Sequence, residues 1–77
     1  MEGRRTFSRS EIKELRSLLR AKEVADDDDE RRRIRRKLRS MGFYISDFSE
    51  GPDPYTAYDF DVDIKQGLID VITDDTT

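Results

Sequence analysis

A dense run of arginines is the part of this chain whose residue types and spacing could carry chemistry. Every residue from 31 to 39 is basic except Ile34 and Leu38. Guanidinium groups present planar sets of hydrogen-bond donors that match phosphate oxygens, and neutralising phosphates releases bound counterions. If Ile34, Leu38 and Met41 form the buried stripe of a helix, the other side of that helix carries a ridge of arginines. These are the predicted nucleic-acid-binding residues: Arg32, Arg33, Arg35, Arg36 and Arg39.

The same run also has a purely structural interpretation. Five acids occupy positions 26–30, directly before it. Acids at the start of a helix and bases toward its end are what the helix macrodipole favours. The acids at 27, 28 and 29 also precede the arginines at 31, 32 and 33 by four residues, the better orientation for ion pairs along a helix. The alternative to a phosphate-binding face is therefore a self-paired, solvated one, and the acids would repel phosphates near that end.

The charge of the chain is divided between its two halves. Residues 1–42 carry 14 Lys or Arg and 9 Asp or Glu, a formal balance of +5, whereas residues 43–77 carry only Lys65 against 9 acids, a balance of −8. Complementary faces mainly set the rate and specificity of association. An acidic face could dock the basic helix of the same chain, that of another copy, or a separate basic protein. Its predicted interaction residues are Asp59, Asp61, Asp63 and Asp70.

Metal binding and catalysis find little support in the residue types. The chain has no Cys and no His, which removes disulfides, thiolate ligands, the usual catalytic triads and nearly every zinc site. Asp59, Asp61 and Asp63 have the spacing of the first three ligands of a calcium loop, but Ile64 stands where that loop needs Gly. No Gly-rich phosphate loop and no nucleophile beside a base is visible. We therefore predict no enzyme activity, no metal, no cofactor and no small-molecule substrate.

Two helices are expected to position the arginines. The first should span about 9–25, because Ser8 and Glu11 form a capping box and Phe7 and Ile12 have the spacing of a hydrophobic staple. The acids favour a break near Asp26, because Asp is a good N-cap and a poor interior residue. The second helix should then run to about 41 and end at Gly 42. The alternative is one unbroken helix, since no Gly or Pro lies between positions 4 and 41.

The second half predicts a small sheet. Residues 43–48 are rich in strand formers, 49–54 have the composition of a loop, and 68–72 should form another strand. Residues 57–66 are ambiguous: apolar residues alternate with Asp as in a strand, whereas Thr56, Asp59 and Gly67 favour a short helix. Six of the seven aromatics fall between 43 and 60, and core packing is their expected role.

Length and composition predict one small α+β domain over 1–77, in which a helical pair packs on a two- or three-stranded sheet. The pair should span about 8–42 and the sheet-containing acidic half about 43–73, with frayed ends at 1–6 and 73–77. No apolar stretch approaches a membrane span and no signal peptide is visible, so a cytoplasmic protein without a membrane partner is expected.

The leading functional hypothesis is a non-enzymatic nucleic-acid-binding or regulatory module that contacts phosphates through the basic helix. Since that helix offers only Arg for base edges, no sequence preference is predicted. The rival hypothesis is a protein-interaction or self-assembly module, in which the basic and acidic faces of different chains meet.

Overall fold

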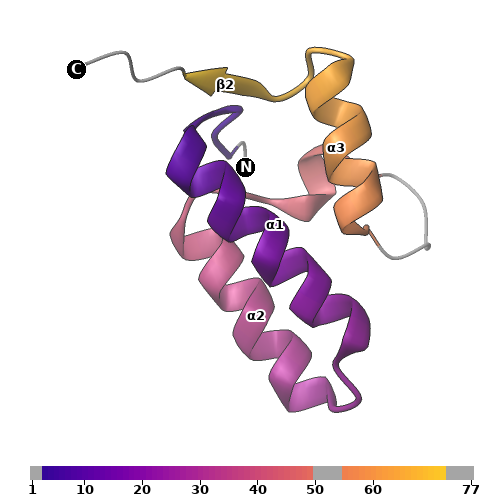
Figure 1. The fold of residues 1–77 in the computed structure, drawn as a ribbon. Helices are drawn as coiled ribbons and strands as arrows, with labels where there is room; N and C mark the ends of the chain where they lie inside the picture. The colour runs from indigo at the N-terminus through magenta and orange to yellow at the C-terminus, as the bar shows by residue number, and fades with distance from the viewer. Residues whose placement is uncertain (1–2, 50–54, 73–77) are drawn as a thin grey trace.

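Three helices and two short strands make up the part of the chain that the structure describes. The structure is a computed structural model and describes residues 3–49 and 55–72. In chain order the elements are β1 (Thr6–Ser8), α1 (Arg9–Val24), α2 (Asp28–Ser40), the 3-10 turn η1 (Ile45–Asp47), α3 (Ala57–Lys65) and β2 (Asp70–Ile72). In Figure 1, α1 lies between α2 on one side and α3 on the other, and β2 crosses the end of the molecule near the N-terminal segment. The predicted α+β class is confirmed.

Helix α1 begins where the capping box predicts. The Ser8 hydroxyl accepts a hydrogen bond from the Glu11 backbone N–H at 3.2 Å, and the Glu11 carboxylate accepts one from the Ser8 N–H at 2.9 Å. Phe7 and Ile12, the two residues of the expected hydrophobic staple, are both buried in the same core cluster. The apolar residues that α1 buries follow helical spacing and form one stripe: Ile12, Leu15 and Leu19. The opposite, polar side of the helix therefore faces solvent.

The acidic run breaks the helical segment in two, so the prediction of two helices is confirmed. Asp27 is the N-cap of α2, and its carboxylate accepts a hydrogen bond from the Asp29 N–H at 3.2 Å. Ala25 has extended backbone angles and ends α1. At the other end of α2, Gly42 has φ of +87°, a left-handed angle that L-residues with a side chain avoid.

The strand expected at 43–48 is wrong. This segment forms the 3-10 turn η1 and no strand, and the only strand pairing among residues 3–49 and 55–72 joins β1 to β2. Phe43 and Phe48 explain the difference, because their rings stack with centroids 5.2 Å apart and planes 11° apart. Residues five apart in a strand point to opposite faces of a sheet. A turn lets both rings pack together, and this tertiary packing overrides the strand propensity.

The sheet obtains its second strand from an unexpected place, the N-terminus. β1 pairs in parallel with β2, with Thr6 opposite Asp70 and Ser8 opposite Ile72. Residues 3–6 were expected to be frayed, yet the Gly3 N–H donates to the Asp47 carboxylate and the Arg4 N–H to the Gly42 carbonyl, both at 2.7 Å. The strand expected at 68–72 is confirmed as the shorter β2. The expected frayed end at 73–77 and most of the expected loop at 49–54 lie outside the described residues.

The ambiguous segment 57–66 is the helix α3. Thr56 is its N-cap and forms a capping box with Asp59. The Thr56 hydroxyl accepts a hydrogen bond from the Asp59 N–H, and the Asp59 carboxylate accepts one from the Thr56 N–H. Gly67, with φ of +83°, follows its C-terminal end. The helical alternative therefore holds, because α3 buries Ala57, Phe60 and Asp63 at helical spacing rather than every second side chain.

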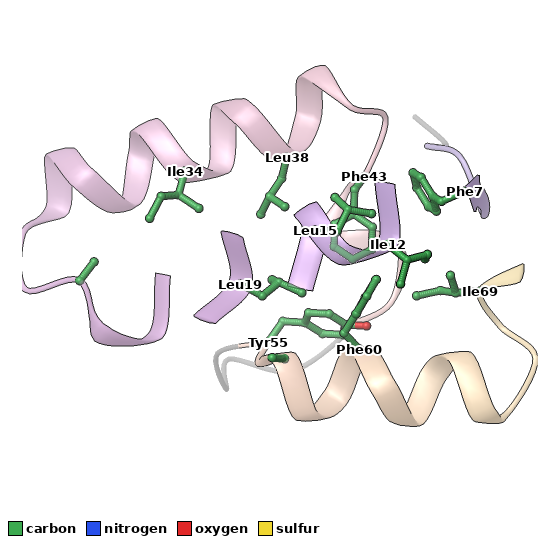
Figure 2. Close-up of a cluster of buried hydrophobic side chains, with 12 residues drawn as sticks. Phe7, Ile12, Leu15, Leu19, Ile34, Leu38, Phe43, Tyr55, Phe60 and Ile69 are labelled. Atoms are coloured by element: carbon green, nitrogen blue, oxygen red, sulfur yellow. The ribbon is translucent and has the colours of Figure 1, made fainter. Parts of the chain in front are cut away.

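Aromatic rings form the centre of the core, as expected for most of them. Phe43 is fully buried and contacts four other rings at centroid distances of 5.2–6.0 Å: Phe7, Phe48, Tyr55 and Phe60. Figure 2 shows Ile34 and Leu38 of α2 pointing into this cluster from one side and Phe60 of α3 from the other. Tyr58 and Tyr44 are the exceptions: 74% of Tyr58 is exposed, and Tyr44 is half-buried outside the core cluster.

Arg4 links three segments at the end of the molecule where the strands lie. Its guanidinium donates to both carboxylate oxygens of Glu11 at 3.0 Å, to the Met41 carbonyl at 3.2 Å and to the Thr6 carbonyl at 3.1 Å. It also lies over the ring of Phe7, 4.8 Å from the centroid. The hydrogen bonds from Arg4 and from the Ser8 N–H hold the pKa of Glu11 at about 2, below its ordinary value of 4.5.

We expect Glu11→Gln to flatten the acid limb of the stability curve. Because the pKa of Glu11 is lower in the folded chain, its contribution is fully present above about pH 4.5 and is lost as the pH falls toward about 2. Urea unfolding between pH 2 and pH 7 measures this. The control is Glu14→Gln, since that carboxylate has only a distant ion pair with Lys37 at 3.9 Å. An acid limb as steep in Glu11→Gln as in the wild type would contradict the prediction.

Candidate functional site

The five predicted phosphate-binding arginines form a continuous ridge on α2. All five are exposed, whereas Ile34 and Leu38 of the same helix are 8% and 1% exposed and face the core. Successive side chains on an α-helix are rotated by about 100°. Three of the arginines therefore point away from the core: Arg32, Arg36 and Arg39. Arg33 and Arg35 lie on the two flanks of this outer surface of α2. We call these five residues the arginine ridge: Arg32, Arg33, Arg35, Arg36 and Arg39.

No carboxylate covers the arginine ridge within the part of the chain that the structure describes. The ion pairs there are Arg4–Glu11, Arg16–Asp61, Arg31–Asp28 and Lys37–Glu14, and none of them includes a residue of the ridge. The self-paired alternative would need Asp28 on Arg32 and Asp29 on Arg33. Asp28 instead pairs with Arg31, three residues along, at 2.8 Å. The guanidinium groups of the ridge are therefore available to an external anion.

The two flanks of the ridge differ in their surroundings. On one flank, Arg33 borders a shallow groove between α1 and α2 whose apolar residues are Leu18 and Ile34. On the other flank, Arg35 lies near Lys22 of α1, a buried residue that is only 6% exposed. Burial, and then the positive charge of Arg35, lower the pKa of Lys22.

The first turn of α2 sets one limit to the ridge. Asp28, Asp29 and Glu30 are exposed there and suit the positive end of the helix dipole. Two of these acids, Asp28 and Asp29, lie on the outward side of the helix, next to Arg32. An approaching polyanion is therefore repelled at the N-terminal turn of α2 and attracted along the rest of the helix.

The structure does not bring the four predicted acidic residues together into one exposed face. Asp59 caps α3, where its carboxylate accepts from the Thr56 N–H and hydroxyl, both at 3.0 Å. Asp63 is buried, and its carboxylate accepts a hydrogen bond from the Tyr55 hydroxyl. Asp70, in β2, is exposed.

Asp61 is engaged with the first helix of the chain. Its carboxylate accepts two hydrogen bonds from the Arg16 guanidinium, at 2.7 and 3.0 Å. The side chain of Asp61 points away from those of Asp59 and Asp63, because residues two apart on a helix are separated by about 200°. Consistent with this, no three acids within residues 3–49 and 55–72 are grouped so that they could hold a metal ion.

The basic and acidic helices lie on opposite sides of the core. Figure 2 shows α2 and α3 facing each other across the buried side chains, with α1 between them. The acidic helix α3 therefore does not dock onto the basic helix α2 of the same chain. The two halves meet instead through Arg16 of α1 and Asp61 of α3. The charge division seen along the sequence becomes a division between two sides of the molecule.

Two buried polar contacts beside the core, between Tyr55 and Asp63 and between Lys22 and Tyr55, were not predicted from the sequence. Burial, and then the hydrogen bond to Asp63, raise the pKa of the Tyr55 hydroxyl far above its ordinary value. The Lys22 ammonium donates to the Tyr55 carbonyl at 3.4 Å. Only the helical form of 57–66, which turns Asp63 inward, would have revealed the first contact, and the spacing Leu15–Leu19–Lys22 places Lys22 on the buried stripe of α1.

Comparisons with known proteins identified no related protein. No protein-family model matches the chain, and neither a curated protein nor a solved structure matches it significantly. Among the described residues, no helix has the length and apolar character needed to cross a lipid bilayer.

Proposed function

We propose that this chain is a small non-enzymatic module that binds nucleic acid through phosphate contacts from α2. The observation that carries the proposal is the arginine ridge: five exposed guanidinium groups on one rigid helix, with no carboxylate within 4.0 Å among the described residues. Arginine forms strong multi-donor hydrogen bonds with phosphate oxygens. A set of five such groups along one helix matches a polyphosphate backbone better than it matches a single small anion.

The chemistry of the ridge predicts the character of the binding. Contacts to phosphates position a protein on nucleic acid but carry no sequence information. Five neutralised phosphates on a DNA duplex would give a slope of log affinity against log salt of about −4.5. Affinity should therefore fall roughly 500-fold between 50 and 200 mM salt, with little dependence on base sequence.

Replacing Arg32, Arg36 and Arg39 together by alanine should abolish binding at physiological salt. These three side chains point most directly away from the core, and alanine keeps the helix because it has the highest helix propensity. The measurement is fluorescence anisotropy with labelled nucleic acid of each kind: duplex DNA, single-stranded DNA and duplex RNA. Far-UV circular dichroism verifies the fold of the variant.

The matched control is the triple variant Arg9→Ala, Lys13→Ala and Arg20→Ala. It removes the same charge from exposed positions on α1, none of which has an ion-pair partner within the described residues. We expect the control to retain most of the binding. Equal losses in the two variants would show a non-specific charge effect, and undiminished binding by the ridge variant, or no binding by the wild type, would overturn the proposed function.

The rival function, self-assembly through basic and acidic faces, is separated by a sizing measurement. It is favoured by the placement of α2 and α3 on opposite sides of the core, but Asp59, Asp61 and Asp63 each already have a partner within the chain. The rival predicts an oligomer that dissociates as salt rises and no binding to any labelled nucleic acid. Size-exclusion chromatography with light scattering at 50 and 500 mM salt tests this directly.

A further inference from the structure

The arrangement of the ridge narrows the kind of nucleic acid that it suits. Resting on the proposed function, we infer that the ligand is double-stranded DNA and that α2 lies in its major groove, with its two flanks against the two phosphate backbones. Four features of the described residues support this: the lack of aromatic residues on α2, the distribution of arginines around the helix, the width of the helix, and the position of the acids.

Single strands need a stacking surface that the ridge lacks. Proteins that bind single-stranded nucleic acid usually stack its bases on exposed aromatic side chains. Tyr58, the most exposed ring among the described residues, lies on α3, across the core from α2. Phe7, Phe43, Tyr55 and Phe60 are buried, and Phe48 is stacked on Phe43. Tyr44, three residues beyond the C-cap of α2, is half-buried, and α2 itself carries no aromatic residue. The arginine ridge therefore has no stacking ring on its own helix.

The arginines surround the exposed part of α2 rather than forming a single row. Arg33 and Arg35 flank the buried Ile34 on opposite sides, and Arg32, Arg36 and Arg39 lie between them on the outer surface. A helix that lies flat on one phosphate strand would use only one side of this set. A helix in a groove meets a phosphate backbone on each side, and it can use both flanks.

The dimensions favour DNA over duplex RNA. An α-helix with its side chains is about 10–12 Å wide, and the major groove of B-form DNA is about 12 Å wide. The major groove of A-form RNA is too deep and narrow for side chains to read. The arginine ridge extends over eight residues, or about 12 Å, which corresponds to three or four base pairs along the duplex axis.

The acids of the first turn orient the helix in the groove. Asp28, Asp29 and Glu30 repel the phosphates, so the N-terminal turn of α2 should lie outside the groove and the turns that carry Arg35, Arg36 and Arg39 should lie inside. This orientation also leaves α3, with its acidic residues, on the side of the core that faces away from the DNA.

The first experiment compares labelled nucleic acids of equal length with the full chain at 50 mM salt. We expect the 16-base-pair DNA duplex to bind at least about fivefold tighter than either single-stranded DNA or duplex RNA of the same sequence, because only the B-form major groove admits the helix. Equal or tighter binding of the single strand or of the RNA would overturn this inference and leave the proposed function standing. Absence of binding to all three would overturn both.

The second experiment tests the groove itself. A DNA duplex with bulky groups on the C5 atoms of its pyrimidines, which project into the major groove, should bind at least about tenfold more weakly than the plain duplex. A ligand that fills the minor groove should leave the affinity unchanged. The opposite pattern, or equal affinity for the plain and the C5-substituted duplex, would overturn the major-groove placement.

The third experiment tests the use of both flanks. Arg33→Ala and Arg35→Ala should each reduce the salt slope on duplex DNA by about 1, and the double variant by about 2. The matched pair Lys13→Ala and Arg20→Ala, exposed on α1, should leave the slope unchanged. A loss confined to one flank would show a helix lying on a single backbone, which contradicts the proposed geometry.

Discussion

Replacing Phe43 by alanine is expected to lower the free energy of unfolding by about 3–5 kcal/mol, the usual cost of removing a buried aromatic ring. Phe43 has no exposed surface and contacts four rings, including an edge-on contact with Phe60 at 5.5 Å and 81°. A domain of 77 residues typically has only about 4–12 kcal/mol in total, so this one change should remove a large part of its stability.

Urea unfolding followed by circular dichroism measures this effect. Tyr58→Ala is the matched control, because 74% of Tyr58 is exposed and the change should cost less than about 0.5 kcal/mol. A cost for Phe43→Ala within about 1 kcal/mol of the control would contradict the central position assigned to this ring.

Alanine at Gly42 is expected to cost more than alanine at Gly67, although the two glycines have almost the same backbone angle. Their φ angles are +87° and +83°, so each substitution carries a left-handed backbone penalty of about 1–2 kcal/mol. A Cβ at Gly67 would meet nothing within 4 Å, whereas one at Gly42 would lie 2.5 Å from Cδ of Arg4. Arg4 would have to move, which weakens its bonds to Glu11 and to the Met41 carbonyl.

The difference between the two glycine variants isolates the role of Arg4. We expect Gly42→Ala to be less stable than Gly67→Ala by about 1 kcal/mol, measured by urea unfolding at pH 7. In an Arg4→Ala background the difference should disappear, because the obstructing side chain is gone. Equal costs of the two substitutions in the wild-type background would show that Arg4 does not hold the end of α2.

The sequence predicted most of the helices correctly because the interactions that begin and end a helix join residues only a few positions apart. The capping boxes at Ser8 and at Thr56 act over three residues, and the left-handed Gly42 ends α2 by its own backbone freedom. The acidic run breaks the helix because Asp27 competes for the backbone N–H groups of the next turn. Each of these features can be recognised without knowing what packs against the segment.

Strands and partners depended on residues far apart in the chain. β1 is three residues long and exists because it pairs with β2, whose residues lie 64 positions later. The strand former Phe43 turned instead toward Phe48 and the rings of Tyr55 and Phe60, because a shared core stabilises it more than sheet hydrogen bonds there would.

For the candidate site, the sequence by itself determined which residues carry the charge and which side of α2 they occupy, since helical periodicity is a local property. Only the tertiary structure decided which charges remain free. Asp61 lies 45 positions from Arg16, and Asp63 reaches the Tyr55 hydroxyl because α3 turns it inward, so both acids are used inside the fold. The arginine ridge lies on the side of the core opposite α3, and this separation leaves its guanidinium groups exposed.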